Sequence, residues 1–480
     1  MPSKPLIPIR VVVISLDSHL RSAVETAEAN LKQSAPGLSI SFHAATDWNR
    51  DAASLEDCKR AVAEADIIVA AMLFIDEHIK PILPALQARR DHCDAIAGCL
   101  SATEVVKLTR LGRFAMDKPQ TGPVAFLKRL RGSSDKKQTG LKQAKLLRRL
   151  PKLLKYIPGA AQDVRAYFLT LQYWLAGSDR NIEGLIANLV HRYAAGPREA
   201  LRKQVTPRPP EDYPDVGVYH PRMSPKIAER ADKLPLARSK KPTVGLLVMR
   251  SYVLSGDAAH YDGVIAALEA RGLRVIPAFA SGLDCRPAME KFFFKRGAPI
   301  VDAVLSLTGF PLVGGPAYND ADAAADMLAD LDVPYVAAHA LEFQSLSEWR
   351  DDARGLTPVE ATMMVAMPEL DGATGPIVFG GRDDGETSTG KQPGHRMRAD
   401  VERADRLAGR VRALIDLRRK TAAERKLAIV IFNFPPNGGA VGTAASLSVF
   451  ESLYNTLIGL KQDGYAVDVP SSVDELRDRL

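Results

Sequence analysis

The chain has 480 residues, of which 46% are apolar and 25% charged, the balance of an ordinary globular protein. This length corresponds to about three domains. The longest uncharged apolar run, at 67–75, is far shorter than the roughly 20 residues that span a bilayer. The composition therefore excludes a disordered chain, a fibrous repeat and a membrane bundle. With only four cysteines and no signal peptide before Asp17, we expect reduced thiols and a cytoplasmic location.

The net charge of +7 comes from one segment. Residues 125–156 contain eleven Lys or Arg and one acid, so the rest of the chain is slightly negative. Its leucines among the charges could dock on an acidic partner or make a peripheral membrane contact, and the alternative is a solvated insertion. Few aromatic residues lie among the basic ones, which argues against nucleic-acid binding.

The first 120 residues alternate strand and helix. Apolar strands are predicted at 10–16, 38–44, 66–73 and 94–100, with a helix that begins after Asp17 and Ser18. Unbroken apolar strands between amphipathic helices predict a doubly wound parallel sheet that is covered on both faces. We assign residues 1–120 to this N-terminal α/β domain.

Two regions of different character follow. Residues 121–205 hold the basic insert and two helical patterns, at 161–174 and 182–193. Residues 206–241 are rich in Pro, Asp and Lys and predict a linker.

A second α/β region occupies residues 242–480. Its predicted strands are 244–249, 274–279, 301–307, 333–338, 377–379, 427–432 and 465–469. Its predicted helices are 260–271, 320–331, 358–366, 398–418 and 444–461. A helix start at Ser471 is followed by the end of the sequence at Leu480, so we expect a chain truncated at its C-terminus.

Ligands of doubly wound sheets bind at the carboxyl ends of the strands. In this region those ends are the loops 250–259, 308–316, 339–343 and 433–443. In the first loop, His260 beside Asp257 could accept a proton or handle a metal, or it could cap and pack a helix. In the last loop, glycines before a helix could bind a carboxylate or form a tight turn.

Other motifs are weaker. Residues 385–391 have P-loop spacing, but Gln392 replaces the required Ser or Thr and Pro393 breaks the helix, which favours a hydrophilic loop. His92, Cys93 and Cys99 lack zinc spacing and predict buried thiols. No HExxH, GxSxG or paired CxxC motif is present.

Several motifs of the second region resemble the large (H) subunit of magnesium chelatase, in the magnesium chelatase/cobaltochelatase large-subunit family. They are VDAVLSLTGFPLVGGP at 301–316, MRSY at 249–252, GDAAHY at 256–261, VPYV at 333–336, PELDGA at 368–373, PIVF at 376–379, FNFPP at 432–436 and VGTAA at 441–445. The N-terminal domain is similar to the domain that precedes the core of this large subunit. The large subunit of cobaltochelatase typically lacks that domain, so the resemblance favours magnesium.

The resemblance implies a ligase that inserts Mg²⁺ into protoporphyrin IX for chlorophyll or bacteriochlorophyll in photosynthesis. ATP is then hydrolysed by the partner I and D subunits, and the metal-inserting residues lie mostly in a part of the family not present here. A flat apolar macrocycle with two propionates needs an apolar slot, cationic or N–H groups and a base. We expect His260 and Asp257 in proton or metal handling, and substrate contacts from nine residues: Arg250, Tyr261, Thr308, Phe310, Asn433, Gly438, Gly439, Gly442 and Thr443.

Two alternatives remain open. The chain could be a non-catalytic binding fragment, or a large subunit of the cobaltochelatase type that acts on a corrin precursor. Residues that ligate a metal are not identified by the sequence.

Overall fold

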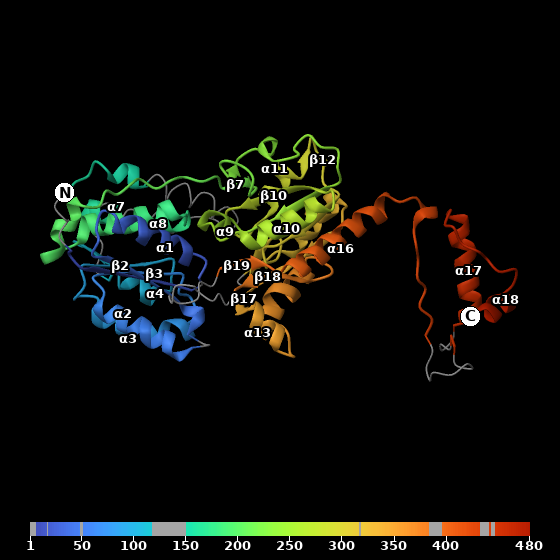
Figure 1. The fold of residues 1–480 in the computed structure, drawn as a ribbon, viewed down its shortest axis with the longest axis horizontal. Helices are drawn as coiled ribbons and strands as arrows, with labels where there is room; N and C mark the ends of the chain where they lie inside the picture. Colours follow the sequence, from blue (N-terminus) through green and yellow to red (C-terminus); the bar gives the residue numbers. More distant parts are fainter. Residues whose placement is uncertain are drawn as a thin grey trace. The chain divides into compact units, whose positions relative to one another are not determined.

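The computed structural model of the protein describes residues 6–16, 18–48, 51–117, 150–315, 318–383, 396–432, 441–442 and 447–480 (Figure 1). The chain divides into two compact units, Met1–Ala408 and Gly409–Leu480, and each is described by itself. Most of the basic segment and the whole P-loop-like segment 385–391 lie outside the described residues.

The first sheet has the strand order β2-β1-β3-β4-β5-β6. Strands β1 to β4 are parallel, and the short β5 and β6 extend the sheet antiparallel. The strands are β1 (Ile9–Ser15), β2 (Leu38–Ala44), β3 (Ile67–Ala71), β4 (Ala95–Cys99), β5 (Arg110–Leu111) and β6 (Phe114–Ala115). The helices between them are α1 (Arg21–Lys32), α2 (Ala52–Glu64), α3 (Asp76–Arg89) and α4 (Thr103–Lys107). The four strands predicted in this region are confirmed.

Both faces of this sheet are apolar because successive side chains of a strand point in opposite directions. Val11 and Val13 belong to the cluster that includes α1, and Val12 and Ile14 belong to the cluster that includes α2 and α3. All four side chains are buried. A parallel sheet covered on both faces is thus the arrangement that the continuous apolar strand requires.

Helices α7 (Ala160–Leu175) and α8 (Asp179–Tyr193) pack on this sheet and complete its core. The Tyr167 hydroxyl donates to the Gly98 carbonyl at 3.3 Å, and Arg198 donates to both Asp94 oxygens at 2.9 Å. This differs from the separate helical region that we predicted at 121–205. The amphipathic helices cover the sheet face beside α1, so residues 160–205 join the N-terminal core.

The second sheet has the strand order β16-β13-β9-β10-β7-β8. Its strands are β7 (Val216–Tyr219), β8 (Ile227–Ala228), β9 (Thr243–Leu247), β10 (Arg274–Ala280), β13 (Ala303–Ser306) and β16 (Tyr335–Ala337). Strand β9 is parallel to β10 and β13, and β7 is antiparallel to β10. Because β7 and β8 lie within 206–241, that segment is not a free linker. Its prolines are tolerated because they lie outside β7 and β8, where they interrupt no ladder hydrogen bond.

Helices α9 (Arg250–Ser255), α10 (Ala259–Ala270), α11 (Arg286–Phe292) and α12 (Ala321–Leu331) connect these strands. A small sheet follows, with the order β17-β18-β19: β17 (His339–Ser345), β18 (Val378–Arg382) and β19 (Met397–Ala399). Helix α10 lies so close to β19 that a Cβ on Gly263 would stand 2.3 Å from the Cβ of Ala399. The predicted helix at 358–366 is formed by α14 (Pro358–Glu360) and a π-helical turn, Ala361–Ala366, which leads into α15 (Met367–Leu370).

The remaining helices are α13 (Leu346–Asp351), α16 (Val401–Arg419), α17 (Val449–Gln462) and α18 (Val473–Arg479). The strands predicted at 427–432 and 465–469 are not formed, and this part of the prediction is wrong for the structure. A strand needs a neighbour for its backbone groups, and in the described part of Gly409–Leu480 neither run has one. No helix within the described residues is long and apolar enough to cross a membrane.

Replacement of Ile186 by Ala tests the placement of α8. The side chain is fully buried in the N-terminal cluster, so its truncation should lower the free energy of unfolding by about 2–5 kcal/mol. Urea unfolding and hydrogen exchange at the β1 amides measure the effect. The half-exposed Leu175→Ala is the matched control, expected to cost less than about 0.5 kcal/mol. Unchanged exchange at β1 in Ile186→Ala would show that the helices are independent of the sheet.

Candidate functional site

The order of the second sheet reverses at β9. The chain passes from β9 to its neighbour β10 and then crosses to β13 on the other side of β9. Ligands of doubly wound sheets bind where the strand order reverses, outside the carboxyl ends of the strands. Here β9 leads into Arg250 and β13, its neighbour, leads into Thr308. Residues 250–255 form α9, however, and the predicted loop 339–343 lies within β17, so these two loops are not formed as predicted.

Four aromatic rings gather where α9 and α10 pack against β18. His260 lies 5.2 Å from Tyr252 edge to face, 3.7 Å from Tyr261, and 5.9 Å from Phe379 in a stacked arrangement, measured between ring centroids. Phe379 comes from β18, and the other three come from α9 and α10. We call these four side chains the aromatic cluster. Its interior is apolar, and His260 Nδ1 is buried there with no hydrogen-bond partner among the described residues.

Burial sets the protonation of the polar groups in this region. Desolvation, with a smaller contribution from the charge of Arg382, lowers the pKa of His260 to about 3. Desolvation likewise lowers the pKa of His339, at the start of β17, to about 4. The pKa of Asp257 is raised by burial, although its carboxylate accepts a hydrogen bond from Met397 N at 3.0 Å. Both imidazoles are therefore neutral at neutral pH.

The structure brings three predicted residues together, Asp257, His260 and Tyr261. Met249 N donates to the Tyr261 hydroxyl at 3.3 Å, and Asp257 ties the start of α10 to β19. His260 and Tyr261 are each 1% exposed. A macrocycle could not touch these rings without a rearrangement of α9 and α10, so the observed geometry favours the packing role. The capping role is not formed, because no side chain accepts a hydrogen bond at the start of α10.

Arg250 lies at the expected place but has a different set of partners. Its guanidinium donates to the carbonyls of Pro214 at 3.0 Å, Leu175 at 3.2 Å and Tyr213 at 3.3 Å. These bonds join the end of α7 and the approach to β7 to the start of α9. The arginine was expected to bind a substrate carboxylate, and the structure shows it holding backbone segments together.

The loop after β13 is held closed by its own side chains. Phe310 N donates to the Thr308 hydroxyl at 3.3 Å, that hydroxyl donates to the Phe310 carbonyl at 3.2 Å, and Gly309 has a φ of +69°. Leu312 N donates to Asp371 at 2.6 Å, and burial raises the pKa of this carboxyl. Thr308 therefore shapes the loop, and Phe310 is half-buried beside it.

The predicted glycine loop cannot be compared with these residues. Asn433, Gly438, Gly439 and Thr443 lie outside the described residues. Gly442 is described in the second unit, where it has a φ of +71° and lies against Val449. Within the described residues, no three His, Cys, Asp or Glu side chains gather closely enough to hold a metal ion.

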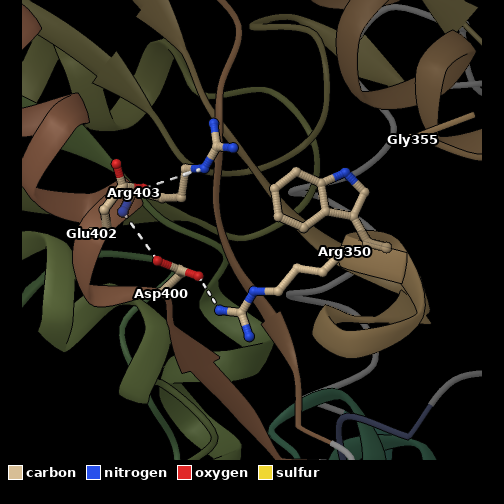
Figure 2. Close-up of a pocket in the computed structure, with 6 residues that line it drawn as sticks. Arg350, Gly355, Asp400, Glu402 and Arg403 are labelled. Carbon is tan, nitrogen blue, oxygen red and sulfur yellow. Dashed lines mark hydrogen bonds and ion pairs between the residues drawn. The ribbon is translucent and has the colours of Figure 1, made fainter. Parts of the chain in front are cut away.

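A ligand-sized pocket that the sequence analysis missed lies at the start of α16. Its volume is about 470 Å³, within the range of small-molecule sites. Its lining residues are Trp349, Arg350, Gly355, Asp400, Glu402 and Arg403 (Figure 2). Two capping signals mark it in the sequence: Ser345 and Glu348 begin α13, and Asp400 precedes α16.

The pocket combines one aromatic face with paired charges. The Arg403 guanidinium lies 5.1 Å from the centre of a Trp349 ring, and Arg350 pairs with Asp400. Burial by itself would raise the pKa of Asp400, but hydrogen bonds from Arg403 N and Arg350 outweigh it and lower this pKa. Asp400 N donates to the Phe379 carbonyl at 2.9 Å, so the pocket adjoins the aromatic cluster.

The four cysteines are buried, and none forms a disulfide. Desolvation raises the pKa of Cys58, Cys99 and Cys285 to about 12. A nucleophilic cysteine needs a lowered pKa, so these thiols serve packing.

Replacement of His260 by Phe tests the buried neutral imidazole. The pKa of this imidazole is 6.5 in the unfolded chain and about 3 in the folded protein. Between these two pH values the unfolded state therefore binds a proton that the folded state does not bind. Acidification therefore costs the folded protein up to about 1.4 kcal/mol per pH unit from this group. His260→Phe should reduce the loss of stability with falling pH, measured by urea unfolding across this range. The exposed His92→Phe is the control, and an equal slope in His260→Phe and the parent would contradict the assignment.

Comparison with known proteins identifies the family. A family model described as CobN/Magnesium Chelatase matches residues 171–480, and one described as a domain of unknown function (DUF3479) matches residues 10–168. The magnesium-chelatase H subunit of Cereibacter sphaeroides is 47% identical over 98% of this chain and 40% of its own length. The corresponding protein of Rhodobacter capsulatus is 48% identical over all of this chain and 41% of its own length.

Cobalt enzymes are more distant in sequence. The aerobic cobaltochelatase protein CobN of Pseudomonas aeruginosa is 29% identical over 61% of this chain and 23% of its own length. The solved catalytic subunit of cobaltochelatase from Mycobacterium tuberculosis shares the fold, with a TM-score of 0.52 and 18% identity over 95% of this chain and 31% of that one.

That coverage includes most of the N-terminal domain. The expectation that cobaltochelatases lack this domain is therefore wrong for this relative, and its presence does not separate the two metals. The chain spans about 40% of the length of the two magnesium-chelatase relatives, and it belongs to the CobN/magnesium chelatase family.

Proposed function

We propose that this chain is the porphyrin-binding part of a magnesium chelatase H subunit, which inserts Mg²⁺ into protoporphyrin IX for chlorophyll or bacteriochlorophyll. The observation that carries the proposal is the identity of 47–48% to two magnesium-chelatase H subunits over nearly the whole chain. Mg²⁺ and the porphyrin are the substrates. Hydrolysis of ATP by partner I and D subunits, a role in photosynthesis and a cytoplasmic location are parts of the same proposal.

The sequence comparisons favour magnesium over cobalt as the metal. The cobaltochelatase relative reaches 29% identity over 61% of the chain, against 47% over 98% for a magnesium relative. Cobalt insertion into a corrin precursor is the second candidate, supported by the shared fold.

The pocket at the start of α16 has the chemistry that a porphyrin edge requires. A flat macrocycle can pack on an aromatic face, and its propionates can accept charge-assisted hydrogen bonds from guanidinium groups. Trp349 supplies the aromatic ring, and Arg350 and Arg403 supply the guanidinium groups. The macrocycle would take the place of the Arg403 guanidinium over that ring, which leaves Arg403 to bond a propionate. We therefore assign the porphyrin contact of this chain to this pocket and give Arg250 and His260 structural roles behind it.

Two measurements test the function. Absorbance titration with protoporphyrin IX asks whether the chain binds the macrocycle. An insertion assay then uses a chimera that joins this chain to the rest of the Rhodobacter capsulatus protein, with I and D subunits, ATP and Mg²⁺ or Co²⁺. Insertion of Mg²⁺ in preference to Co²⁺ is expected. Binding without insertion would support a non-catalytic module, and loss of both would overturn the proposal.

Replacement of Arg350 or Arg403 by Ala tests the pocket. Each loses a charge-assisted hydrogen bond to a propionate, which should weaken protoporphyrin binding by about tenfold. Arg354→Ala is the matched control because Arg354 is 89% exposed, pairs with Asp352 and does not line the pocket. Quenching of tryptophan fluorescence measures the affinity. Equal affinities for the parent, Arg350→Ala and Arg403→Ala would exclude this pocket.

A further inference from the structure

One carboxylate behind the pocket at the start of α16 is completely buried. Glu360, the last residue of α14, is 0% exposed and does not line the pocket. Its oxygens accept hydrogen bonds from the Phe343 amide at 3.1 Å, the Gln344 side chain at 2.7 Å and the Thr357 hydroxyl at 2.9 Å. A buried carboxylate is costly unless its oxygens are satisfied, and a fully satisfied one makes its surroundings rigid.

These hydrogen bonds close the base of the loop that forms one wall of the pocket. The donors lie at the end of β17 and directly before α14, so the bonds join the two ends of residues 344–357. This segment, which we call the wall loop, contains α13 and three of the residues that line the pocket (Figure 2). The Gln344 side chain also donates to the Gly355 carbonyl at 3.2 Å. Hydrogen bonds therefore connect Glu360 through Gln344 to the lining of the pocket.

A capping role explains only part of this arrangement. Glu360 forms a capping box with Thr357 at the start of α14, and Glu424 forms the same box with Thr421 on an exposed turn. The hydrogen bonds that Glu360 accepts from the end of β17 are not part of a capping box. They tie the start of the helix to a strand about fifteen residues earlier in the chain.

The contacts across the pocket are the ones that a ligand would replace. Arg350 pairs with Asp400, and the Arg403 guanidinium lies 5.1 Å from the centre of a Trp349 ring. Both contacts tie the wall loop to the start of α16. A propionate at Arg350 and a macrocycle on Trp349 would displace both, so the wall loop must then be held from its other side.

Apolar packing holds one end of the wall loop better than the other. At its start, Leu346 is buried in a small apolar cluster. Near its end, Leu356 is only partly buried, and a Cβ added to Gly355 would meet no atom of the described residues within 4 Å. Hydrogen bonds are directional and packing is not. The position of Gly355 therefore depends on the hydrogen bonds of Gln344 and Glu360.

We propose that Glu360 is a positioning residue of the pocket. Its carboxylate holds α13 and Gly355 in place relative to the start of α16 while a ligand exchanges the contacts across the pocket. A site that is held in its binding conformation loses less conformational entropy when a ligand binds, which raises affinity. The identity of that ligand as a porphyrin rests on the proposed function.

The pattern of donors requires a carboxylate at this position. An ionised carboxylate only accepts hydrogen bonds, and both Glu360 oxygens face N–H or O–H donors. A glutamine has nearly the same shape, but it offers one acceptor oxygen and one NH₂ group. In either orientation that NH₂ group would face a donor. Glu360→Gln therefore breaks hydrogen bonds with little change in volume.

Hydrogen exchange tests these bonds without a ligand. In Glu360→Gln the amide of Phe343 or of Thr357, whichever faces the NH₂ group, should exchange about tenfold faster. The β9 amides, protected in parent and variant, show that the fold is intact. Glu424→Gln is the matched control, because Glu424 forms the same capping box with Thr421, is exposed and does not line the pocket. Unchanged exchange at both amides in Glu360→Gln would overturn the proposal.

Kinetics of the chimera separate positioning from stability. In the insertion assay, Glu360→Gln should raise the KM for protoporphyrin IX about tenfold and leave kcat unchanged, because the displaced wall loop weakens binding. Absorbance titration of the variant chain should show the same loss of affinity. A merely structural defect would lower the fraction of folded enzyme and so reduce kcat at an unchanged KM. That pattern, or kinetics equal to those of the parent, would contradict the proposal.

Gln344→Met is the second variant and decides the question if Glu360→Gln does not fold. It keeps the carboxylate and nearly the volume of the side chain, but it removes the donor that links Glu360 to the Gly355 carbonyl. Protoporphyrin binding should weaken about fivefold. Affinity equal to that of the parent would overturn the proposal.

The failure of this proposal is distinguishable from the failure of the proposed function. If Arg350→Ala and Arg403→Ala weaken protoporphyrin binding but Glu360→Gln and Gln344→Met do not, the pocket binds porphyrin and Glu360 does not position it. If none of the four variants weakens binding, the pocket is not the porphyrin site and both proposals are overturned.

Discussion

The structure depends on one constraint, that a parallel strand with two apolar faces must be covered on both of them. In the N-terminal sheet, α7 and α8, which follow the basic segment in the chain, cover the sheet face beside α1. In the second sheet it places α9 to α12 between the strands. In the described part of Gly409–Leu480 the constraint is not met, because Leu427, Ile429 and Val430 remain exposed.

The same burial determines the chemistry at the strand ends. His260 and Asp257 are held where the charged forms of both side chains are disfavoured, and their neighbours are aromatic rings and backbone groups. A proton acceptor must reach its substrate, and these side chains face the interior. The porphyrin contact that we propose is therefore placed at the rim, where α13 and α16 leave a pocket beside the aromatic cluster.

Local patterns predict most strands and helices here because apolar periodicity and capping residues act over a few positions. The four parallel strands of the N-terminal sheet, β1 to β4, are found within two residues of the predicted bounds. Long-range contacts are not visible in such patterns. Three such contacts join positions that are far apart in the sequence. They are the pairing of β7 with β10, the hydrogen bonds of Arg250 to backbone carbonyls, and the contact between Trp349 and Arg403. The strand at 427–432 was predicted from composition, but pairing needs a partner.

The paired charges of the pocket do not exclude an anionic ligand. Arg350 is half-exposed, and ion pairs of that kind contribute about 0–1 kcal/mol. If a propionate binds Arg350, the Asp400 carboxylate still accepts a hydrogen bond from Arg403 N. It also remains at the N-terminus of α16, where a negative charge is stabilised. The carboxylate of Asp400 is therefore not left without partners. Exchange of one carboxylate for another at Arg350 costs little, while packing of the macrocycle on Trp349, in place of the Arg403 guanidinium, would bury apolar surface.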